Sequence, residues 1–142
     1  SLIGIYEYFE NLYNHHFDSK NLSTLKKVEK INNLISTHEE NIANPILNYL
    51  YERKDLNLIG KNKINNKDRA PTISFYSNKK TSKEIAHNLN SFKIATRNDN
   101  FYAWRCLNHL GVNTDDGVIR LSIVHYNSSQ DVKNVINALE KI

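Results

Sequence analysis

The sequence has little of what several classes of protein need. It contains one cysteine, so an intrachain disulfide and a cysteine-based metal cluster are both excluded. Because a chain without disulfides suits a reducing compartment, we expect a cytoplasmic protein. Its four glycines are widely spaced and form no glycine-rich phosphate-binding loop. No apolar run approaches the ~18–20 residues of a membrane-spanning helix, which excludes a membrane-spanning protein.

The basic excess is mild. Of 142 residues, 39% are hydrophobic and 24% are charged, which suits one folded domain, or one domain with an appended helix. The net charge of +4 comes from 14 lysines and five arginines, and its densest stretches, 26–30 and 61–67, are interrupted by neutral or acidic residues. Nucleic-acid-binding proteins gather basic charge on one face. We therefore predict no nucleic-acid partner.

The hydrophobic periodicity changes along the chain. Residues 2–17 and 22–51 show helical spacing, and Pro45 predicts a bend or a fresh start in the second helix. Beyond them we expect strands at 56–60, 70–76, 92–96 and 118–126, and helices that begin near residues 81, 100 and 128. This alternation predicts an α/β fold of the α+β sandwich type. Its small, mostly antiparallel sheet carries helices on one face and follows long linking helices.

The cysteine and histidine positions give no convincing metal site. Cys106 and His109 lie three residues apart on one expected helix, a spacing that lets two side chains contact one metal. No second pair of ligands accompanies them, so we expect a packed cysteine and a histidine at the rim. A reactive thiol needs exposure and an activating charge, so Cys106, expected beside Leu107 in mid-helix, is predicted to be inert.

Arg120 is the most informative single residue. It interrupts an otherwise apolar or small strand, residues 118–124, where an arginine needs a partner of opposite charge. One interpretation is a structural salt bridge or a position on an edge strand. The other is a functional arginine whose planar fork grips a carboxylate through two hydrogen bonds. Alternation alone does not separate the two.

Residues 97–105 form a polar loop that leads into an aromatic helix start. The simpler interpretation takes Asp99 or Asn100 as the helix cap and the aromatic residues as core. The functional interpretation places Arg97 and Tyr102 on a loop that faces a substrate. The residues alone favour the simpler interpretation.

Three segments carry a resemblance to a known family: 69–75, 94–103 and 117–127, the last with its Arg120 strand and Tyr126-Asn127 turn. The chain resembles the C-terminal small domain of class V aminotransferase-fold enzymes, which use pyridoxal 5'-phosphate. Within them it is similar to the cysteine desulfurase and selenocysteine lyase-like proteins. The resemblance implies the C-terminal part of a fold-type I enzyme.

The resemblance also implies a domain organisation. Residues 1–17 correspond to the last helix of a large domain, 18–55 to interdomain helices and 56–142 to the small domain. Its own N-terminal large domain, which binds most of the pyridoxal 5'-phosphate, is then a partner of this segment. An amino-acid substrate and a homodimeric assembly follow from the same resemblance.

The resemblance assigns roles to three residues. Arg120 takes the place of the arginine that binds the α-carboxylate of the substrate. Arg97 matches the arginine that opens the active-site loop, and Tyr102 stands where desulfurases keep a nucleophilic cysteine. No catalytic, cofactor-binding or metal-binding residue is expected within the segment.

The expected function is that of a substrate-orienting domain. As part of a longer chain it serves a pyridoxal-phosphate-dependent transferase or lyase, and alone it is not catalytic. The alternative is a stand-alone, non-catalytic α+β binding or regulatory module.

Overall fold

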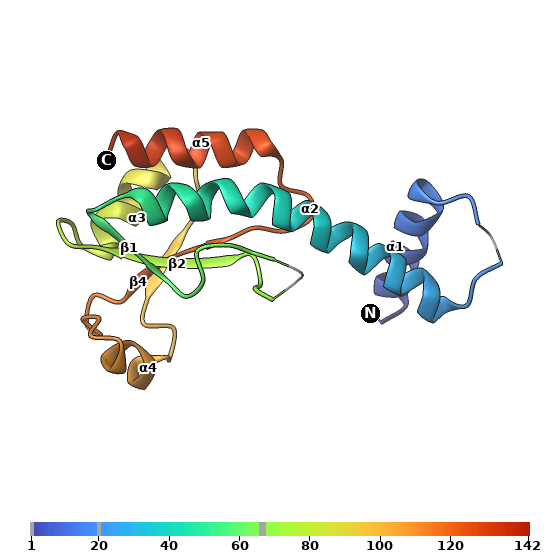
Figure 1. Cartoon of the computed structure of the whole chain (residues 1–142), viewed down its shortest axis with the longest axis horizontal. Helices are drawn as coiled ribbons and strands as arrows, with labels where there is room; N and C mark the ends of the chain where they lie inside the picture. The colour runs from blue at the N-terminus through green and yellow to red at the C-terminus, as the bar shows by residue number, and fades with distance from the viewer. Residues whose placement is uncertain (1, 20, 66–67) are drawn as a thin grey trace. The chain divides into compact units, whose positions relative to one another are not determined.

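A computed structural model describes residues 2–19, 21–65 and 68–142 of the chain. It contains two compact units, residues 1–38 and 39–142, with α2 contributing to both. In chain order the elements are α1 (Leu2–His16), α2 (Thr24–Glu52), β1 (Leu56–Ile59), β2 (Thr72–Ser77), α3 (Ser82–Ser91), β3 (Arg97–Asp99), α4 (Trp104–His109), β4 (Val118–Ser122) and α5 (Ser129–Glu140) (Figure 1). This is the order of helices and strands that the sequence predicts.

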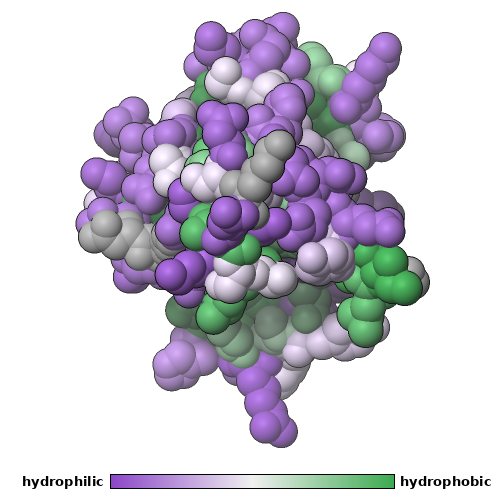
Figure 2. All heavy atoms as spheres, turned by 90° about the vertical axis from the view of Figure 1, so that its right-hand side faces the viewer, coloured by the Kyte–Doolittle hydropathy of each residue, from purple (hydrophilic) through white to green (hydrophobic). Residues whose placement is uncertain are grey.

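Residues 1–38 pair α1 with the first part of α2 around few buried side chains. Tyr13 and Ile31 are buried, and the Tyr13 hydroxyl donates to the Ser19 carbonyl at 2.8 Å. The Lys27 ammonium lies 2.9 Å from the Glu10 carboxylate. Many apolar side chains of α1 remain exposed: Leu2, Ile3, Ile5, Tyr6 and Tyr8. Figure 2 shows apolar side chains reaching the surface between hydrophilic ones.

The second unit is built on a sheet in the order β1-β2-β4-β3, antiparallel at every described pairing. The prediction of a small antiparallel sheet is therefore confirmed. Its register pairs Ser74 with Arg120, and Arg97 with Arg120. Because β4 lies between β2 and β3, the edge-strand interpretation of Arg120 is wrong.

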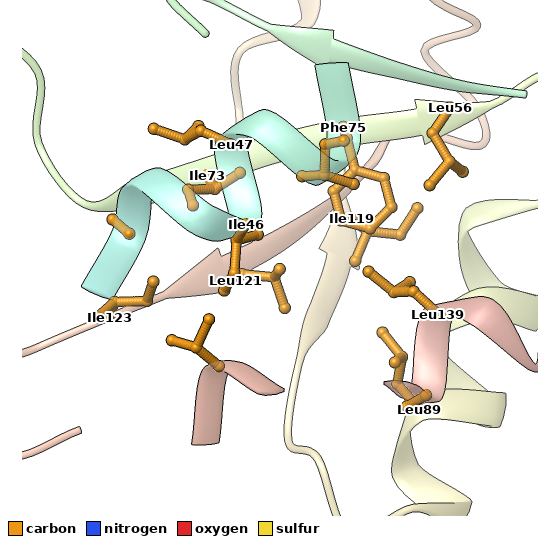
Figure 3. Close-up of a cluster of buried hydrophobic side chains, with 14 of the residues drawn as sticks. Ile46, Leu47, Leu56, Ile73, Phe75, Leu89, Ile119, Leu121, Ile123 and Leu139 are labelled. Carbon is orange, nitrogen blue, oxygen red and sulfur yellow. The ribbon is translucent and has the colours of Figure 1, made fainter. Parts of the chain in front are cut away.

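The main hydrophobic core lies between one face of this sheet and the helices. Alternation along β2 and β4 directs Ile73, Phe75, Ile119 and Leu121 into it. They meet apolar residues of α2, α3 and α5, including Ile46, Leu47, Leu89 and Leu139, as Figure 3 shows. Burying each large aliphatic side chain contributes about 1.5–3 kcal/mol.

The residues that alternate with these core residues lie on the opposite face. A second cluster, with Leu107 and Val112, covers that face at Tyr76 and Val118. The remaining part, which carries Ser74, Arg120 and Arg97, is called the open face here.

The caps expected for α3 and α5 are present, whereas the cap expected at Asp99 or Asn100 is wrong, because α4 starts after Ala103 and has no side-chain cap. Thr81 caps α3 and forms a capping box with Glu84, and Ser128 does the same for α5 with Asp131. The helix α2 runs through Pro45 without a break, so the fresh start expected there is wrong. Proline weakens a helix interior, but the buried Ala43, Ile46 and Leu47 fix the helix on both sides of it.

The three largest differences from the predicted boundaries in the second half concern β3, α4 and β4. Residues 92–96 close the end of α3, where Lys93 has φ 61° and the Ile94 amide donates to the Leu89 carbonyl, so β3 begins only at Arg97. The helix α4 starts at Trp104 instead of residue 100, because a turn precedes it. The strand β4 ends at Ser122 instead of 126.

An ion pair fixes the turn between α2 and β1. The Arg53 guanidinium donates to both oxygens of Asp55, at 2.8 and 2.7 Å. The Asp55 carbonyl in turn accepts the Asn78 amide and the Ser77 hydroxyl. The hydrogen bonds from Arg53 lower the pKa of Asp55 from its ordinary value of 3.8 to about 2.

This lowered pKa predicts an acid-sensitive contribution to stability. The carboxyl group is harder to protonate in the folded chain, so its stabilisation is complete above about pH 4 and is lost as the pH falls towards about 2. Asp55→Asn should therefore remove about 1 kcal/mol from the free energy of unfolding at neutral pH and flatten its dependence on pH over that window. Urea unfolding at a series of pH values measures this. Asp115→Asn, which removes an exposed carboxylate outside this pair, is the matched control, and equal pH profiles for both variants would contradict the assignment.

Candidate anion-binding site

A row of polar residues crosses the open face of the sheet. The register places Ser74 of β2 opposite Arg120 of β4, and Arg120 opposite Arg97 of β3. Directly opposed residues of an antiparallel pair share a face, with Cβ atoms about 4.5–5.5 Å apart. The structure therefore brings together two of the three residues that the sequence singled out.

Neither arginine has a carboxylate partner among the residues that the structure describes. The ion pairs found there join Lys27 to Glu10, Arg53 to Asp55 and Lys61 to Asp68. The salt bridge considered for Arg120 is thus not formed within the described chain. Like charges directly opposite each other destabilise a sheet. Two such cations without a counter-charge favour an anion between them.

The Arg120 side chain is held by an aromatic ring. Its guanidinium carbon lies 4.2 Å from the centre of the Phe101 ring, and Arg120 is half-buried. The ring itself packs against a small cluster formed by Leu107, Val112 and Val118. A stacked guanidinium keeps the N–H groups at its edge available for hydrogen bonds. Phe101 thus restricts the motion of the fork while leaving it able to bind a planar anion.

The loop that carries Phe101 is strained. Phe101 and Tyr102 have φ angles of 53° and 61°, a region that bulky residues rarely occupy. The turn is closed by the Ala103 amide, which donates to the Asn100 carbonyl at 2.9 Å, and by the Tyr102 amide, which donates to Asn100 Oδ1. Each such residue costs about 1–3 kcal/mol, and strain of this kind is concentrated at functional loops. The same turn leaves the Tyr102 side chain fully exposed.

A buried network holds the strand β3 in place. The Ser82 amide donates to the Asp116 carboxylate at 2.9 and 3.0 Å, and the Ser82 hydroxyl donates to the Asp116 carbonyl. The Asn98 amide group donates to the Ser82 hydroxyl at 3.1 Å. Asn98 is next to Arg97, so the start of α3 and the turn before β4 together fix the strand that carries Arg97. Sequence reasoning did not identify this network.

The environment of Cys106 differs from the prediction. Cys106 is exposed, whereas its neighbour Leu107 is buried. The expectation of a packed cysteine is wrong because α4 is a short helix that turns Leu107 inward and Cys106 outward. His109 is exposed, as expected. Within residues 2–19, 21–65 and 68–142, no group of three or more histidine, cysteine, aspartate or glutamate side chains is placed to hold a metal ion.

One groove of the described chain is not lined by the arginine row. It has a volume of about 660 Å³ and runs between α5, residues 92–95 and the end of β4. Arg97, Tyr102 and Arg120 do not line it. Its acidic residue, Asp131, already accepts the Ser128 amide at 2.8 Å in the cap of α5. Lys93 and Lys141 also line the groove, but neither is one of the residues that the sequence singled out.

Comparison with known proteins identifies the family. The model of the aminotransferase class-V family matches residues 22–135, so the chain belongs to the class V aminotransferases. An aminotransferase-like protein, FGM3 of Gibberella zeae, is 28% identical over 109 residues, which are 76% of this chain and 27% of that protein. The chain thus spans about a quarter of the length of this relative.

Solved structures with the same fold are similar over most of the chain. A cysteine desulfurase from Thermococcus onnurineus NA1 matches with a TM-score of 0.69 and 24% identity, over 83% of this chain and 28% of that one. The cysteine desulfurase CsdA from Escherichia coli matches with a TM-score of 0.62 and 21% identity, over 74% and 24%. These likenesses confirm the predicted α/β fold. In the described part of the chain, no helix is long and apolar enough to cross a membrane.

The turn at Gly117 can be used to test what positions the loop that carries Phe101. A Cβ atom at Gly117 would lie 2.3 Å from the carbonyl carbon of Asp99, and the residue has φ 73°. Gly111 has nearly the same φ, 72°, but open space around its Cα atom. We predict that Gly111→Ala lowers the free energy of unfolding by about 1–2 kcal/mol and that Gly117→Ala lowers it by about 1–3 kcal/mol more.

Urea unfolding of the two variants measures this difference. The larger loss at Gly117 has a physical reason, since the added methyl group pushes β4 away from the end of β3. Equal losses at the two glycines would show that the close approach to Asp99 does not hold the loop.

Proposed function

We propose that this chain is the substrate-orienting part of a pyridoxal-phosphate-dependent enzyme that acts on an amino acid. The observation that carries the proposal is Arg120, an inner-strand arginine on the open face of the sheet with no carboxylate partner in the described chain. Membership of the class V aminotransferase family supports it. In this proposal Arg120 binds the α-carboxylate of the substrate, while Arg97 and Tyr102 line the same site.

The chemistry of the arginine row suits a carboxylate. A guanidinium presents parallel N–H groups that match the two oxygens of a carboxylate, which fixes the direction of the ligand as well as its position. Pyridoxal phosphate, when bound, supplies an electron sink for a bond to the α-carbon. The residues of this chain contribute orientation, and holding reactants in the productive geometry lowers a reaction barrier by several kcal/mol.

The described lysines do not fit the role of the residue that joins the cofactor covalently. A lysine of that kind needs a desolvated position in a pocket. Lys27 is half-buried but paired with Glu10, and the other lysines of the described residues are exposed on the surface. The residues present fit the carboxylate of a substrate, and we propose that the cofactor is held mainly by a large domain outside this segment.

The domain organisation is part of the same proposal. Residues 1–17 are proposed as the last helix of the large domain, 18–55 as interdomain helices and 56–142 as the small domain. Several apolar residues of α1 are exposed, among them Leu2 and Ile3. This supports the proposal that another part of the protein packs against α1. Residues 39–55 fold together with 56–142 in one compact unit. A homodimeric assembly and a cytoplasmic location are proposed from the likeness to the family alone.

The test uses the complete, cofactor-loaded protein. Exchange of the α-proton of L-amino acids in deuterium oxide, followed by NMR, reports activation of the amino acid whatever the final product. Arg120→Lys keeps the charge but loses one of two parallel hydrogen bonds, so we expect the exchange efficiency of the most reactive amino acid to fall by roughly ten- to a hundredfold. The thermal midpoint should stay within about 2 °C, because no ion pair is lost.

Arg105→Lys is the matched control, since Arg105 is exposed on α4 outside the sheet. It should leave both the exchange and the thermal midpoint unchanged. A destabilised Arg120→Lys variant with normal exchange would defeat the assignment of Arg120. No exchange with any amino acid in the unmodified protein would favour a non-catalytic binding module instead.

A further inference from the structure

We propose that the site takes a substrate with two anionic groups, an amino acid whose side chain also ends in an acid. This inference rests on the proposed function, because it assigns the α-carboxylate to Arg120. It adds that Arg97 binds the second anionic group. The observation behind it is the direct pairing of the two arginines across β3 and β4.

The charge balance of the site favours two anions over one. Arg53 is neutralised by Asp55, and Arg69 donates to the carbonyls of Lys61, Ile59 and Thr72. Neither Arg97 nor Arg120 has a carboxylate partner among the described residues. A ligand with a single carboxylate neutralises one of the two guanidinium groups and leaves the other next to it. A ligand with two acids neutralises both.

Two acids lie close to the row along the chain, and neither pairs with an arginine in the described residues. Asp99 lies on β3 two residues after Arg97, and its Oδ1 accepts the Asn100 amide at 2.7 Å. Asp116 accepts the Ser82 amide. Asp99 shares the face of β3 with Arg97, but the described residues form no ion pair between it and either arginine. The two guanidinium groups therefore remain able to bind the acids of a ligand.

The two arginines differ in a way that assigns their roles. Arg120 is half-buried on an inner strand and stacked on Phe101, which suits the group that every amino-acid substrate shares. Arg97 is exposed at the start of the edge strand β3, with room to meet side chains of different length. Ser74, opposite Arg120 in the same row, adds a neutral hydroxyl and no competing charge. Arg97 is therefore the residue that determines specificity.

The test measures binding of succinate and butyrate, acids of the same chain length that carry two and one carboxylates. Neither has an amino group, so binding is read without turnover, by calorimetry on the complete protein at low salt. We expect unmodified protein to bind succinate at least about tenfold more tightly than butyrate. Arg97→Gln should reduce that ratio to about twofold or less while leaving butyrate affinity nearly unchanged. Arg97→Lys, which keeps the charge, should retain most of the preference.

Arg105→Gln is the matched control and should bind both acids as the unmodified protein does. Arg120→Gln should weaken both acids. If Arg120→Gln weakens both but Arg97→Gln keeps the preference for succinate, the two-anion inference is overturned and the proposed function stands. If Arg120→Gln weakens neither, the proposed function fails and the two-anion inference fails with it.

Discussion

The constraint on which the site depends is an uncompensated pair of positive charges, Arg97 and Arg120, facing each other across two strands. The antiparallel register fixes them on one face, and the helices α2, α3 and α5 bury the other face. On the opposite face a small cluster around Leu107 covers one end, and the part that carries Arg97 and Arg120 stays open in the described chain. Cross-strand repulsion costs stability, and a bound anion removes that cost. This arrangement supports the proposal that an anionic ligand binds between the two strands.

The loop next to these two arginines also contains an unfavourable local conformation that contacts with other parts of the unit stabilise. Phe101 and Tyr102 occupy a strained region of the backbone. Their position is maintained by the cluster around Leu107 and by the close approach of Gly117 to Asp99. Strain persists only where the surroundings determine it. These contacts keep Tyr102 exposed at the surface and stack Phe101 on Arg120, the residue central to the proposed function.

Local signals in the sequence predicted most of the fold and part of the site. Capping residues such as Thr81 and Ser128 act within one turn, so the helix starts they predict were confirmed. The apolar strand around Arg120 marked it as a residue that needs an anionic partner, and its role in substrate binding stays a prediction. The position of β3, the outward turn of Cys106 and the link from Ser82 to Asp116 depend on contacts distant in sequence. Periodicity within one element contains no information on such contacts.

The stability of an Arg120→Met variant of this chain tests the central claim most directly. Methionine keeps an apolar contact with Phe101 and removes one of the two opposed charges. The account predicts a free energy of unfolding within about 1 kcal/mol of the unmodified chain when no anion is present, because no ion pair is broken and repulsion by Arg97 is relieved. A loss of about 3–5 kcal/mol is the cost of breaking a buried ion pair. That result would contradict the account by showing that Arg120 has a structural partner.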